Sequence, residues 1–322
     1  MLVTGAGGFI GSHLVERLVN VGAQVRALVR YNSKADIGNL RWLPSDTLEH
    51  VEIYAGNICA AETVARAMCD VDIVFHLAAS VSIPYSYKHP REVADVNIMG
   101  TLNVLTAALD RPVERLLMTS TSEVYGTAQY VPIDENHPRQ AQSPYAASKI
   151  GADALALSFH KSYGLPVSIV RPFNTYGPRQ SARAVIPTII AQALTASEIH
   201  LGNTDTTRDF NYVSDTVEGF LMVASSPHSL GEEINIGSGA EISIADLSRK
   251  IVSILGKTVT IRTDQQRLRP DRSEVMRLLC ASDKARRVLG WHPTVSLEQG
   301  ILTTAEWIEQ HVAIFSPQRY SI

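Results

Sequence analysis

The chain has 322 residues, of which 45% are hydrophobic, and a formal net charge of -3. This length suffices for one large domain or two fused ones around a substantial core. Without a basic cluster, the charge gives no electrostatic reason to expect nucleic acid or a membrane surface as a partner. No apolar run reaches the about 18 residues of a membrane span, and no signal-peptide pattern opens the chain, so we expect a soluble cytoplasmic protein.

The cysteines exclude two further classes of protein. Cys59, Cys69 and Cys280 are an odd number and lack metal-ligand spacing. They fit a reducing compartment and argue against a disulfide framework and against a zinc site. We therefore expect no metal, and any anionic ligand has to be bound by a few well-placed arginines.

The first half of the chain alternates β-rich runs with helical stretches. Expected helices cover residues 93–109 and begin again near Tyr145. Strands separated by helices indicate parallel β-α-β units, which predicts an α/β fold with a doubly wound parallel sheet of about seven strands. The expected strands are LVTG, QVRALVR, VEIYAG, DIVFHLAA, RLLMTST and PVSIVRPFN. Since the first strand directly follows Met1, a start further upstream stays open.

The second half has a looser pattern. Residues 1–175 are expected to form the cofactor-binding domain, to which later segments return, and residues 176–322 a smaller mixed α/β lobe that binds substrate. We assign the segments EIHLG, RDFNYV, EEINIGSG and TVTIRT to this lobe. No repeat or flexible linker separates the halves, so they should pack as one body.

A glycine-rich run, GAGGFIGSHL, follows the first strand and opens a helix. In that context glycines allow a tight turn and a close approach of the backbone to a pyrophosphate, which lies at the positive helix N-terminus. This predicts a Rossmann-type NAD(P) site, in which the cofactor-binding residues of the turn are Gly5, Gly8, Phe9, Ile10 and Gly11.

The second strand bears on the choice of cofactor. An acidic residue at its end usually accepts from the ribose 2′-hydroxyl of NAD, whereas an arginine suits the 2′-phosphate of NADP. Here the strand ends LVRY, without an acid. NADP is slightly favoured over NAD, with Arg30 as the phosphate partner, while a solvated Arg30 that stacks on adenine stays open.

Two more strand ends are expected beside the cofactor. Asn57 and Ile58 follow the third strand, where Asn57 can hydrogen-bond the adenine amino group. Leu77, Ala78 and Ala79 end the fourth strand and are small enough for the backbone to approach the cofactor. A plain buried strand end would look the same.

The chemistry is expected from two neighbouring motifs, TSTSEVYG and YAASK. Tyr145 and Lys149 are spaced i, i+4 and share a helix face. A lysine ammonium near a phenol lowers its pKa, so the tyrosinate can take a proton from a substrate hydroxyl. With Thr121 holding the substrate oxygen, Thr121, Tyr145 and Lys149 form a triad that oxidises an alcohol to a ketone.

The motifs GAGGFIGSHL, HLAAS, TSTSEVYG, YAASK, RPFNTYGPR and TRDFNYVSD together resemble the extended short-chain dehydrogenases that act on nucleotide sugars. The Thr-Ser-Glu run at residues 121–123 is similar to that of nucleotide-sugar 4,6-dehydratases, such as GDP-mannose 4,6-dehydratase. RPFNTYGPRQSARAVIP and RLRPDRSEV resemble dehydratases of the legionaminic-acid type, which act on an N-acetylglucosamine nucleotide. The resemblance also implies a homodimer with a four-helix interface built from residues 93–109 and 145–162.

This resemblance implies a role for Glu123 as a base. Once C4 of the sugar is a ketone, the C5 proton is acidic, and a carboxylate can remove it while water leaves C6. Relatives with Thr-Asp-Glu use the aspartate as the acid for the leaving hydroxyl. Ser122 cannot be an equal acid, so water or Glu123 itself is expected to protonate that group. A merely solvated Glu123 is the alternative.

The resemblance also implies a nucleotide-diphosphate sugar as substrate and a cofactor that stays tightly bound and is recycled in each turnover. Bidentate arginine suits phosphate oxygens. The substrate-binding residues expected on this ground are Ser82, Asn174, Arg183, Arg208 and Arg269.

Three other activities stay open at this point. A UDP-glucuronate decarboxylase shares Thr-Ser-Glu and needs a cation for the C6 carboxylate, which Arg179 or Arg183 could supply. A 4-epimerase is disfavoured by Glu123. A cofactor-sensing binding protein without turnover is disfavoured by the intact Thr121, Tyr145 and Lys149.

Overall fold

The structure, a computed structural model, describes residues 1–315. Its main sheet has seven strands in the order β10-β6-β5-β4-β1-β2-β3, and every neighbouring pair is parallel. The strands are β1 (Leu2–Thr4), β2 (Val25–Arg30), β3 (Val51–Gly56), β4 (Ile73–His76), β5 (Arg115–Thr119), β6 (Val167–Pro172) and β10 (Glu233–Ile236). The α/β fold with a doubly wound parallel Rossmann sheet is confirmed. The assignment of EEINIGSG to the second lobe is wrong, because this segment forms β10 at the sheet edge.

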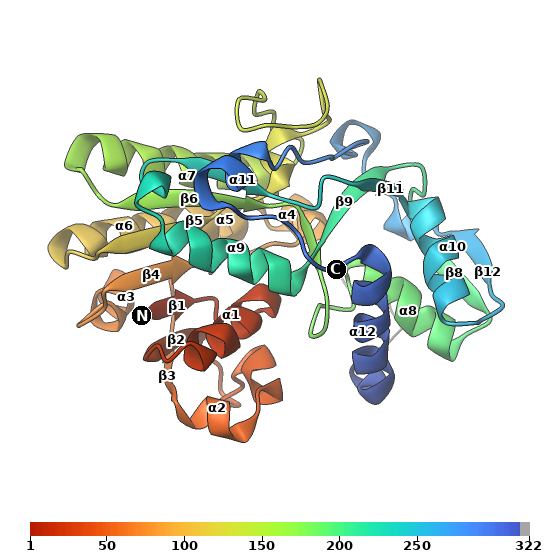
Figure 1. Ribbon diagram of the computed structural model, residues 1–322, viewed down its shortest axis with the longest axis horizontal. Coiled ribbons are helices and arrows are strands. Elements are labelled where there is room, and N and C mark those ends of the chain that lie inside the picture. Colours follow the sequence, from red (N-terminus) through yellow and green to blue (C-terminus); the bar gives the residue numbers. More distant parts are fainter. Residues whose placement is uncertain (316–322) are drawn as a thin grey trace.

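Helices cover both faces of this sheet (Figure 1). One face is covered by α1 (Phe9–Asn20), α2 (Ser45–Glu49), α9 (Val213–Ser225) and α11 (Asp283–Leu289), and the other by α3 (Ala61–Ala67), α6 (Gly100–Asp110) and α7 (Pro144–Tyr163). Successive strand residues point to opposite faces. Leu117 therefore packs in the first core and its neighbours Leu116 and Met118 in the second. Both faces need apolar residues, which explains the continuous apolar runs of these strands.

The helix expected over residues 93–109 consists of three parts. It begins as α5 (Pro90–Ala94), continues through a π-helical turn (Asp95–Met99) and ends as α6. A π turn holds one residue more than an α turn, and such turns are frequent at functional sites. This one contains the buried Asn97.

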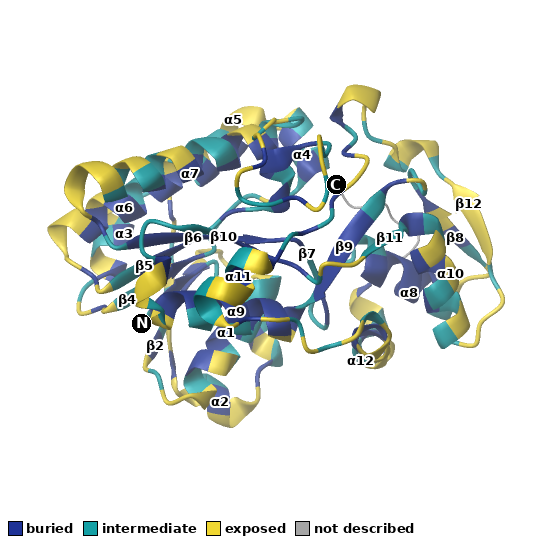
Figure 2. Cartoon of the chain, turned by 45° about the horizontal axis from the view of Figure 1, so that its top comes forward, coloured by how far each residue is buried: buried dark blue, intermediate teal, exposed yellow. Residues whose placement is uncertain are grey.

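The second lobe packs around its own apolar core (Figure 2). Its small sheets have the orders β11-β9-β7 and β12-β8. Their strands are β7 (Asn174–Tyr176), β8 (Glu198–Leu201), β9 (Thr207–Tyr212), β11 (Glu241–Ser243) and β12 (Thr260–Thr263), and the helices are α8 (Val185–Thr195), α10 (Ile244–Ile254) and α12 (Leu297–Gln310). The short helix α4 (Ile83–Lys88) follows β4.

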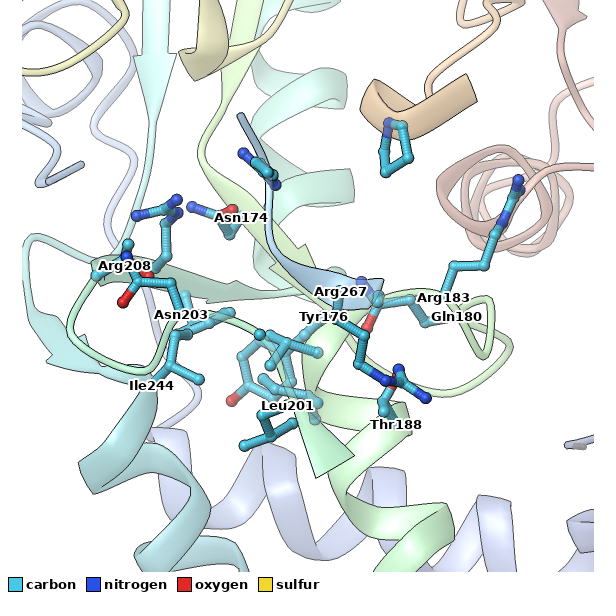
Figure 3. Close-up of a pocket in the computed structure, with 18 of the residues that line it drawn as sticks. Asn174, Tyr176, Gln180, Arg183, Thr188, Leu201, Asn203, Arg208, Ile244 and Arg267 are labelled. Carbon is cyan, nitrogen blue, oxygen red and sulfur yellow. The ribbon is translucent and has the colours of Figure 1, made fainter. Parts of the chain in front are cut away.

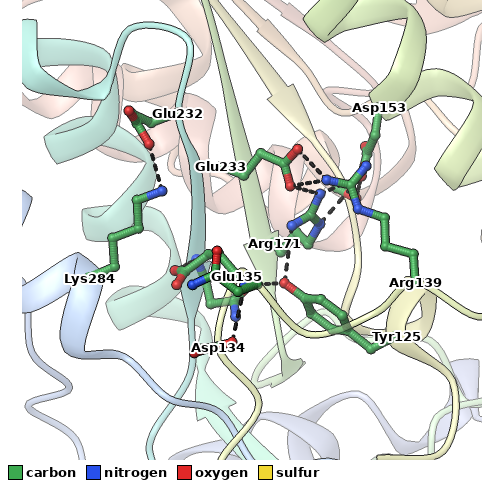
Figure 4. A network of polar contacts seen from close by, with 12 residues as sticks. Tyr125, Asp134, Glu135, Arg139, Asp153, Arg171, Glu232, Glu233 and Lys284 are labelled. Carbon is green, nitrogen blue, oxygen red and sulfur yellow. Dashed lines mark hydrogen bonds and ion pairs between the residues drawn. The ribbon is translucent and has the colours of Figure 1, made fainter.

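A buried network of ion pairs joins strands β6 and β10 of the main sheet to helix α7 (Figure 4). Arg171 on β6 is fully buried, and its Nη2 lies 3.0 Å from Asp153 Oδ2 on α7. The same guanidinium pairs with Glu233 on β10 and donates to the hydroxyl of Tyr125 at 3.0 Å. Burial opposes ionisation of Glu233, but Arg171 and Arg139 outweigh it and hold the pKa of this carboxyl below its usual value.

We predict that Arg171→Met destabilises the fold strongly. The change leaves Asp153 and Glu233 buried without their shared cation, and breaking a buried pair in this way costs about 3–5 kcal/mol. Lys284→Met is the control, because it removes the ion pair with the half-exposed Glu232 and a charge that acts on Glu135 but leaves the Arg171 contacts in place, and it should cost about 0–1 kcal/mol. Thermal unfolding of both variants measures the difference, and equal shifts would show that the Arg171 network contributes no more than a surface pair.

Candidate functional site

The glycine turn between β1 and α1 leaves no room for side chains. Gly5 has a φ of +69°, and a Cβ there would lie 2.7 Å from the backbone nitrogen of Ala78. A Cβ at Gly11 would lie 2.3 Å from the carbonyl oxygen of Gly5. Helix α1 starts with Gly8 as N-cap, with no side-chain cap and no acid in its first turn. Its N–H groups and positive end therefore suit an anion, and the turn fits the diphosphate of NAD(P).

The other expected cofactor residues lie at the carboxyl ends of adjacent strands. Phe9 and Ile10 begin α1, and Arg30 ends β2 with an exposed guanidinium that forms no ion pair within residues 1–315. Asn57 is exposed, and its side-chain oxygen accepts from the N–H of Cys59 at 3.0 Å. Ile58 is buried beside Gly100, so its side chain belongs to the core.

The segment after β4 is held against the glycine turn by a threonine and a histidine. Thr4 Oγ1 accepts from the N–H of Ala78 at 3.1 Å and lies 2.8 Å from Nδ1 of His76. Burial, together with the charge of Lys149, lowers the pKa of His76 to about 3, so this imidazole is neutral. Leu77, Ala78 and Ala79 thus form the wall opposite Gly5.

The Thr-Ser-Glu run forms a tight turn directly after β5. Thr121 is the N-cap of a 3₁₀ turn (Ser122–Tyr125), and its Oγ1 accepts from the N–H of Glu123 at 3.3 Å. Ser122 is buried, whereas Thr121 and Glu123 are partly exposed. Because Tyr125 of the same turn is bound by Arg171, the turn is fixed to the buried ion network.

Tyr145 and Lys149 lie in the first two turns of α7, and both are buried. Burial raises the pKa of Tyr145 well above its usual value, a hydrogen bond with Thr121 opposes that shift, and the charge of Glu123 adds to it. The structure thus places the phenol near Thr121 and Glu123. Nζ of Lys149 donates to the carbonyl of Thr119 at 2.5 Å. Desolvation of the phenol is the largest cause of this shift, and a lowering of the pKa of Tyr145 by Lys149 stays a prediction.

Asn97 is a site residue that the sequence did not single out. Its Nδ2 donates to Ser148 Oγ at 2.8 Å and to the carbonyl of Ser80 at 3.1 Å, and its Oδ1 accepts from the N–H of Ser80 at 2.7 Å. Asn97 therefore connects the segment that follows β4 to α7, the helix that carries Tyr145. The only signal was an amide in an apolar helical pattern, DVNIMG.

A pocket of about 330 Å³ is lined by residues of the second lobe and by Pro84 of α4 (Figure 3). Of the expected substrate residues, Asn174, Arg183, Arg208 and Arg269 line it. Asn174 and Arg208 lie side by side in Figure 3, on the paired strands β7 and β9, and Arg183 lies toward the opposite side of the view. Ser82 does not line the pocket; it caps α4 by accepting from the N–H of Tyr85 at 3.3 Å.

The positive charge of the pocket is only partly compensated. Glu274, another lining residue, lies 3.5 Å from Arg208 and 3.6 Å from Arg269. Nη1 of Arg269 is buried and has no hydrogen-bond partner within residues 1–315. Burial lowers the pKa of Arg208, and the nearby charge of Glu123 opposes this shift. Two arginines thus share one carboxylate next to the Thr-Ser-Glu turn, which suits a ligand with phosphate groups.

Arg179 is not available to a ligand in this pocket. Its Nη2 pairs with Glu16 on α1 at 2.7 Å, and the side chain is 10% exposed. Arg179 is not among the residues that line the pocket. Of the two arginines considered for a substrate carboxylate, only Arg183 lines it.

No helix within residues 1–315 has the length and apolar character needed to cross a bilayer. No group of three or more His, Cys, Asp or Glu side chains in the same range is arranged to hold a metal ion.

The sequence matches known proteins along nearly its whole length. A family model described as GDP-mannose 4,6 dehydratase matches residues 2–304. The "UDP-glucose 4-epimerase" of Mycolicibacterium smegmatis is 35% identical, covering 95% of this chain and 97% of the relative. The "dTDP-D-glucose 4,6-dehydratase" of Mus musculus is 33% identical, with 97% and 89% covered. The "UDP-glucuronic acid decarboxylase 6" of Arabidopsis thaliana is 33% identical, with 94% and 86% covered.

Solved structures agree with these matches. The structure of DesIV, a dTDP-glucose 4,6-dehydratase from Streptomyces venezuelae with NAD and TYD bound, superposes with a TM-score of 0.88 at 30% identity and covers 99% of both chains. The relatives are thus dehydratases, epimerases and decarboxylases of nucleotide sugars. Together with the glycine turn, the Tyr145 and Lys149 pair and the arginine-lined pocket, this shows that the chain belongs to the GDP-mannose 4,6-dehydratase family of extended short-chain dehydrogenases.

Proposed function

We propose that the protein is a 4,6-dehydratase that converts a nucleotide-diphosphate hexose, with N-acetylglucosamine as the sugar, to its 4-keto-6-deoxy form. The observation that carries this proposal is the position of Glu123. Its charge raises the pKa of Tyr145 and opposes the lowering of the pKa of Arg208, so it lies near both. A base near the oxidising tyrosine and the phosphate-binding arginine suits elimination from the sugar ring.

The first half-reaction is assigned to Thr121, Tyr145 and Lys149. Thr121 holds the C4 oxygen, and Tyr145 takes its proton, which requires the raised pKa of the phenol to fall when ligands are bound. A bound nicotinamide would supply reversible uptake of the C4 hydrogen as hydride. Its reduced form would absorb in the near ultraviolet. Lys149, held by the carbonyl of Thr119, is placed to orient the cofactor ribose and to stabilise the tyrosinate.

The second half-reaction is assigned to Glu123. The C4 ketone acidifies the C5 proton, and Glu123 removes it as the C6 hydroxyl leaves. Ser122 is buried and is a far weaker acid than the aspartate of other dehydratases, so Glu123 or a water delivers the proton to the leaving group. Return of the C4 hydride to C6 and of a proton to C5 then gives the 4-keto-6-deoxy sugar and the oxidised cofactor.

The sugar nucleotide is assigned to the pocket. Asn174, Arg208 and Arg269 bind the diphosphate, and Arg183 lies farther along the same pocket. A contact of Ser82 with the sugar stays a prediction, because Ser82 caps α4 and does not line this pocket. The choice of N-acetylglucosamine rests on RPFNTYGPRQSARAVIP and RLRPDRSEV, which supply Arg183 and Arg269 to this pocket.

A UDP-glucuronate decarboxylase is the second candidate. Arg183 lines the pocket and offers a cation for a C6 carboxylate. Arg179, paired with Glu16, does not add a second one. The reaction of a 4-epimerase does not need Glu123 as a base, and a binding protein without turnover does not need Tyr145 as a catalytic group.

For the cofactor we propose NADP or NAD, with a slight preference for NADP. Arg30 is exposed at the end of β2 without an ion pair in residues 1–315, and no acid follows it. NAD is the cofactor present in the related DesIV structure. The proposed preference for NADP over NAD therefore rests on the guanidinium of Arg30 alone.

We also propose that the protein is a homodimer. The stretch from Pro90 to Asp110 packs alongside α7 (Figure 1). On its outer side Met99 and Leu109 are 47% and 36% exposed, and Ala147 and Ala154 of α7 are exposed beside them. An apolar pair of helices suits a four-helix interface with a second copy.

Glu123→Gln is predicted to separate the two half-reactions. The amide keeps size and hydrogen bonding but removes basicity, so C4 oxidation should proceed and near-ultraviolet absorbance should build up. Formation of the 4-keto-6-deoxy product should fall roughly 10²- to 10⁴-fold, the usual effect of losing a general base. Absorbance spectra and mass spectrometry of the sugar nucleotide measure both.

Tyr145→Phe is the comparison for this variant, since it should give neither absorbance nor product. In wild-type turnover in deuterated water, the product should carry deuterium at C5. A pentose and carbon dioxide would instead identify a decarboxylase, and turnover of Glu123→Gln at the wild-type rate would make the glutamate structural.

Arg30→Asp is predicted to shift preference from NADP toward NAD. The change removes the cation for the 2′-phosphate and adds an acceptor for a ribose hydroxyl. Titration of each cofactor into the protein measures the ratio of dissociation constants. Arg66→Asp on α3 is a control that should not move this ratio, and an unchanged ratio in Arg30→Asp would make Arg30 a bystander.

Met99→Glu is predicted to weaken the dimer by placing a charge in its apolar interface. Leu302→Glu, at a 42% exposed position on α12, is the control. Sedimentation velocity at micromolar concentration should show a dimer for the wild type and the control and more monomer for Met99→Glu. A monomeric wild type would rule the dimer out.

A further inference from the structure

One loop of the second lobe is held by residues of the cofactor side. The loop covers residues 177–184 and connects β7 to α8. Its members Gln180 and Arg183 line the pocket. Nε2 of His13 on α1 lies 2.9 Å from the carbonyl of Pro178, and Glu16, one turn later, pairs with Arg179. The pocket wall is thus attached to the helix that begins at the glycine turn.

Arg179 has an unusual backbone and environment. Its φ is +67° although it is not glycine, a conformation that L residues seldom adopt. Its side chain is almost buried, and Nη1 has no hydrogen-bond partner within residues 1–315. Burial and the neighbouring Arg179 lower the pKa of His13 to about 4, so His13 is neutral and carries its proton on Nε2 to donate to Pro178.

Asn39 connects the same loop to the glycine turn. Its Nδ2 donates to the carbonyl of Arg179 at 3.0 Å, and its backbone N–H donates to the carbonyl of Gly7 at 2.8 Å. The preceding Gly38 is packed so closely that a Cβ there would lie 2.4 Å from the Gly7 oxygen. A continuous chain of contacts therefore runs from Gly7 through Asn39 and Arg179 to Gln180.

On the pocket side the loop is equally well anchored. Nε2 of Gln180 donates to the carbonyl of Thr175 on β7 at 2.8 Å, and its backbone N–H donates to Gly177 at 3.3 Å. The loop is therefore attached both to the glycine turn and to β7.

We propose that Asn39 and Arg179 are positioning residues that couple the two ligand sites, so that occupation of the glycine turn by the cofactor sets the pocket wall for the nucleotide sugar. The inference rests on the proposed function, because it requires both ligands. Coupling of this kind is reciprocal: the nucleotide strengthens cofactor binding by the same factor by which the cofactor strengthens nucleotide binding.

The experiment measures this factor by calorimetry on cofactor-stripped protein. UDP, dTDP and GDP are each titrated into the wild type with and without saturating NADP or NAD. The variants are then compared with the nucleotide and the cofactor that the wild type binds most tightly. We expect the cofactor to tighten nucleotide binding roughly five- to 150-fold. In Asn39→Ala and in Arg179→Gln this factor should fall close to one, and Arg179→Lys, which keeps the charge next to Glu16, should restore part of it.

Arg17→Gln is the matched control, since it removes another Arg–Glu pair of α1, the exposed one with Glu218 at 3.2 Å. It should keep the wild-type factor. A merely structural role of Asn39 or Arg179 would lower both affinities and the melting temperature but leave their ratio unchanged, and that result would overturn the inference. So would a wild-type factor near one. Failure of the wild type to bind any nucleoside diphosphate would instead refute the proposed function.

Discussion

A guanidinium buried between two carboxylates fixes the catalytic half of the molecule. Arg171 lies on β6, Asp153 on α7 and Glu233 on β10, and Tyr125 in the turn after β5 binds the same cation. Because a buried charge that loses its partner is costly, these four elements cannot shift independently. The turn with Thr121 and Glu123 and the helix with Tyr145 and Lys149 are thereby held in one frame.

The pocket proposed for the substrate depends on the balance between its arginines and a single carboxylate. A chain with a net charge of -3 concentrates cations in one pocket, where Arg208 and Arg269 share Glu274. The shared carboxylate makes the ligand-free pocket tolerable, and it leaves one arginine nitrogen unsatisfied. A diphosphate brings more negative charge and more acceptor oxygens than one carboxylate, so it can satisfy both guanidinium groups.

Much of the fold and part of the site could be predicted from sequence because the signals are local. Apolar runs, the glycine spacing and the Tyr145 and Lys149 pair each lie within one or two elements. The return of residues 233–236 to the sheet edge depends on a long-range pairing with β6, and no local pattern encodes it. The same holds for Asn97, whose partners Ser80 and Ser148 are distant in sequence. The raised pKa of Tyr145 could not be predicted either, because burial is a tertiary property.

The π turn at Asp95–Met99 gives one helical stretch two unrelated duties. An extra residue in a turn rotates everything after it by about 100° relative to a regular α-helix. Within this turn Asn97 contacts Ser80 and Ser148, while Met99, two positions later and so on the opposite side of the helix, is 47% exposed. The amide side of the helix is constrained by Ser80 and Ser148, whereas about half of the methionine is exposed. Substitutions at Met99 can thus change the outer surface of the helix without altering the hydrogen bonds of Asn97.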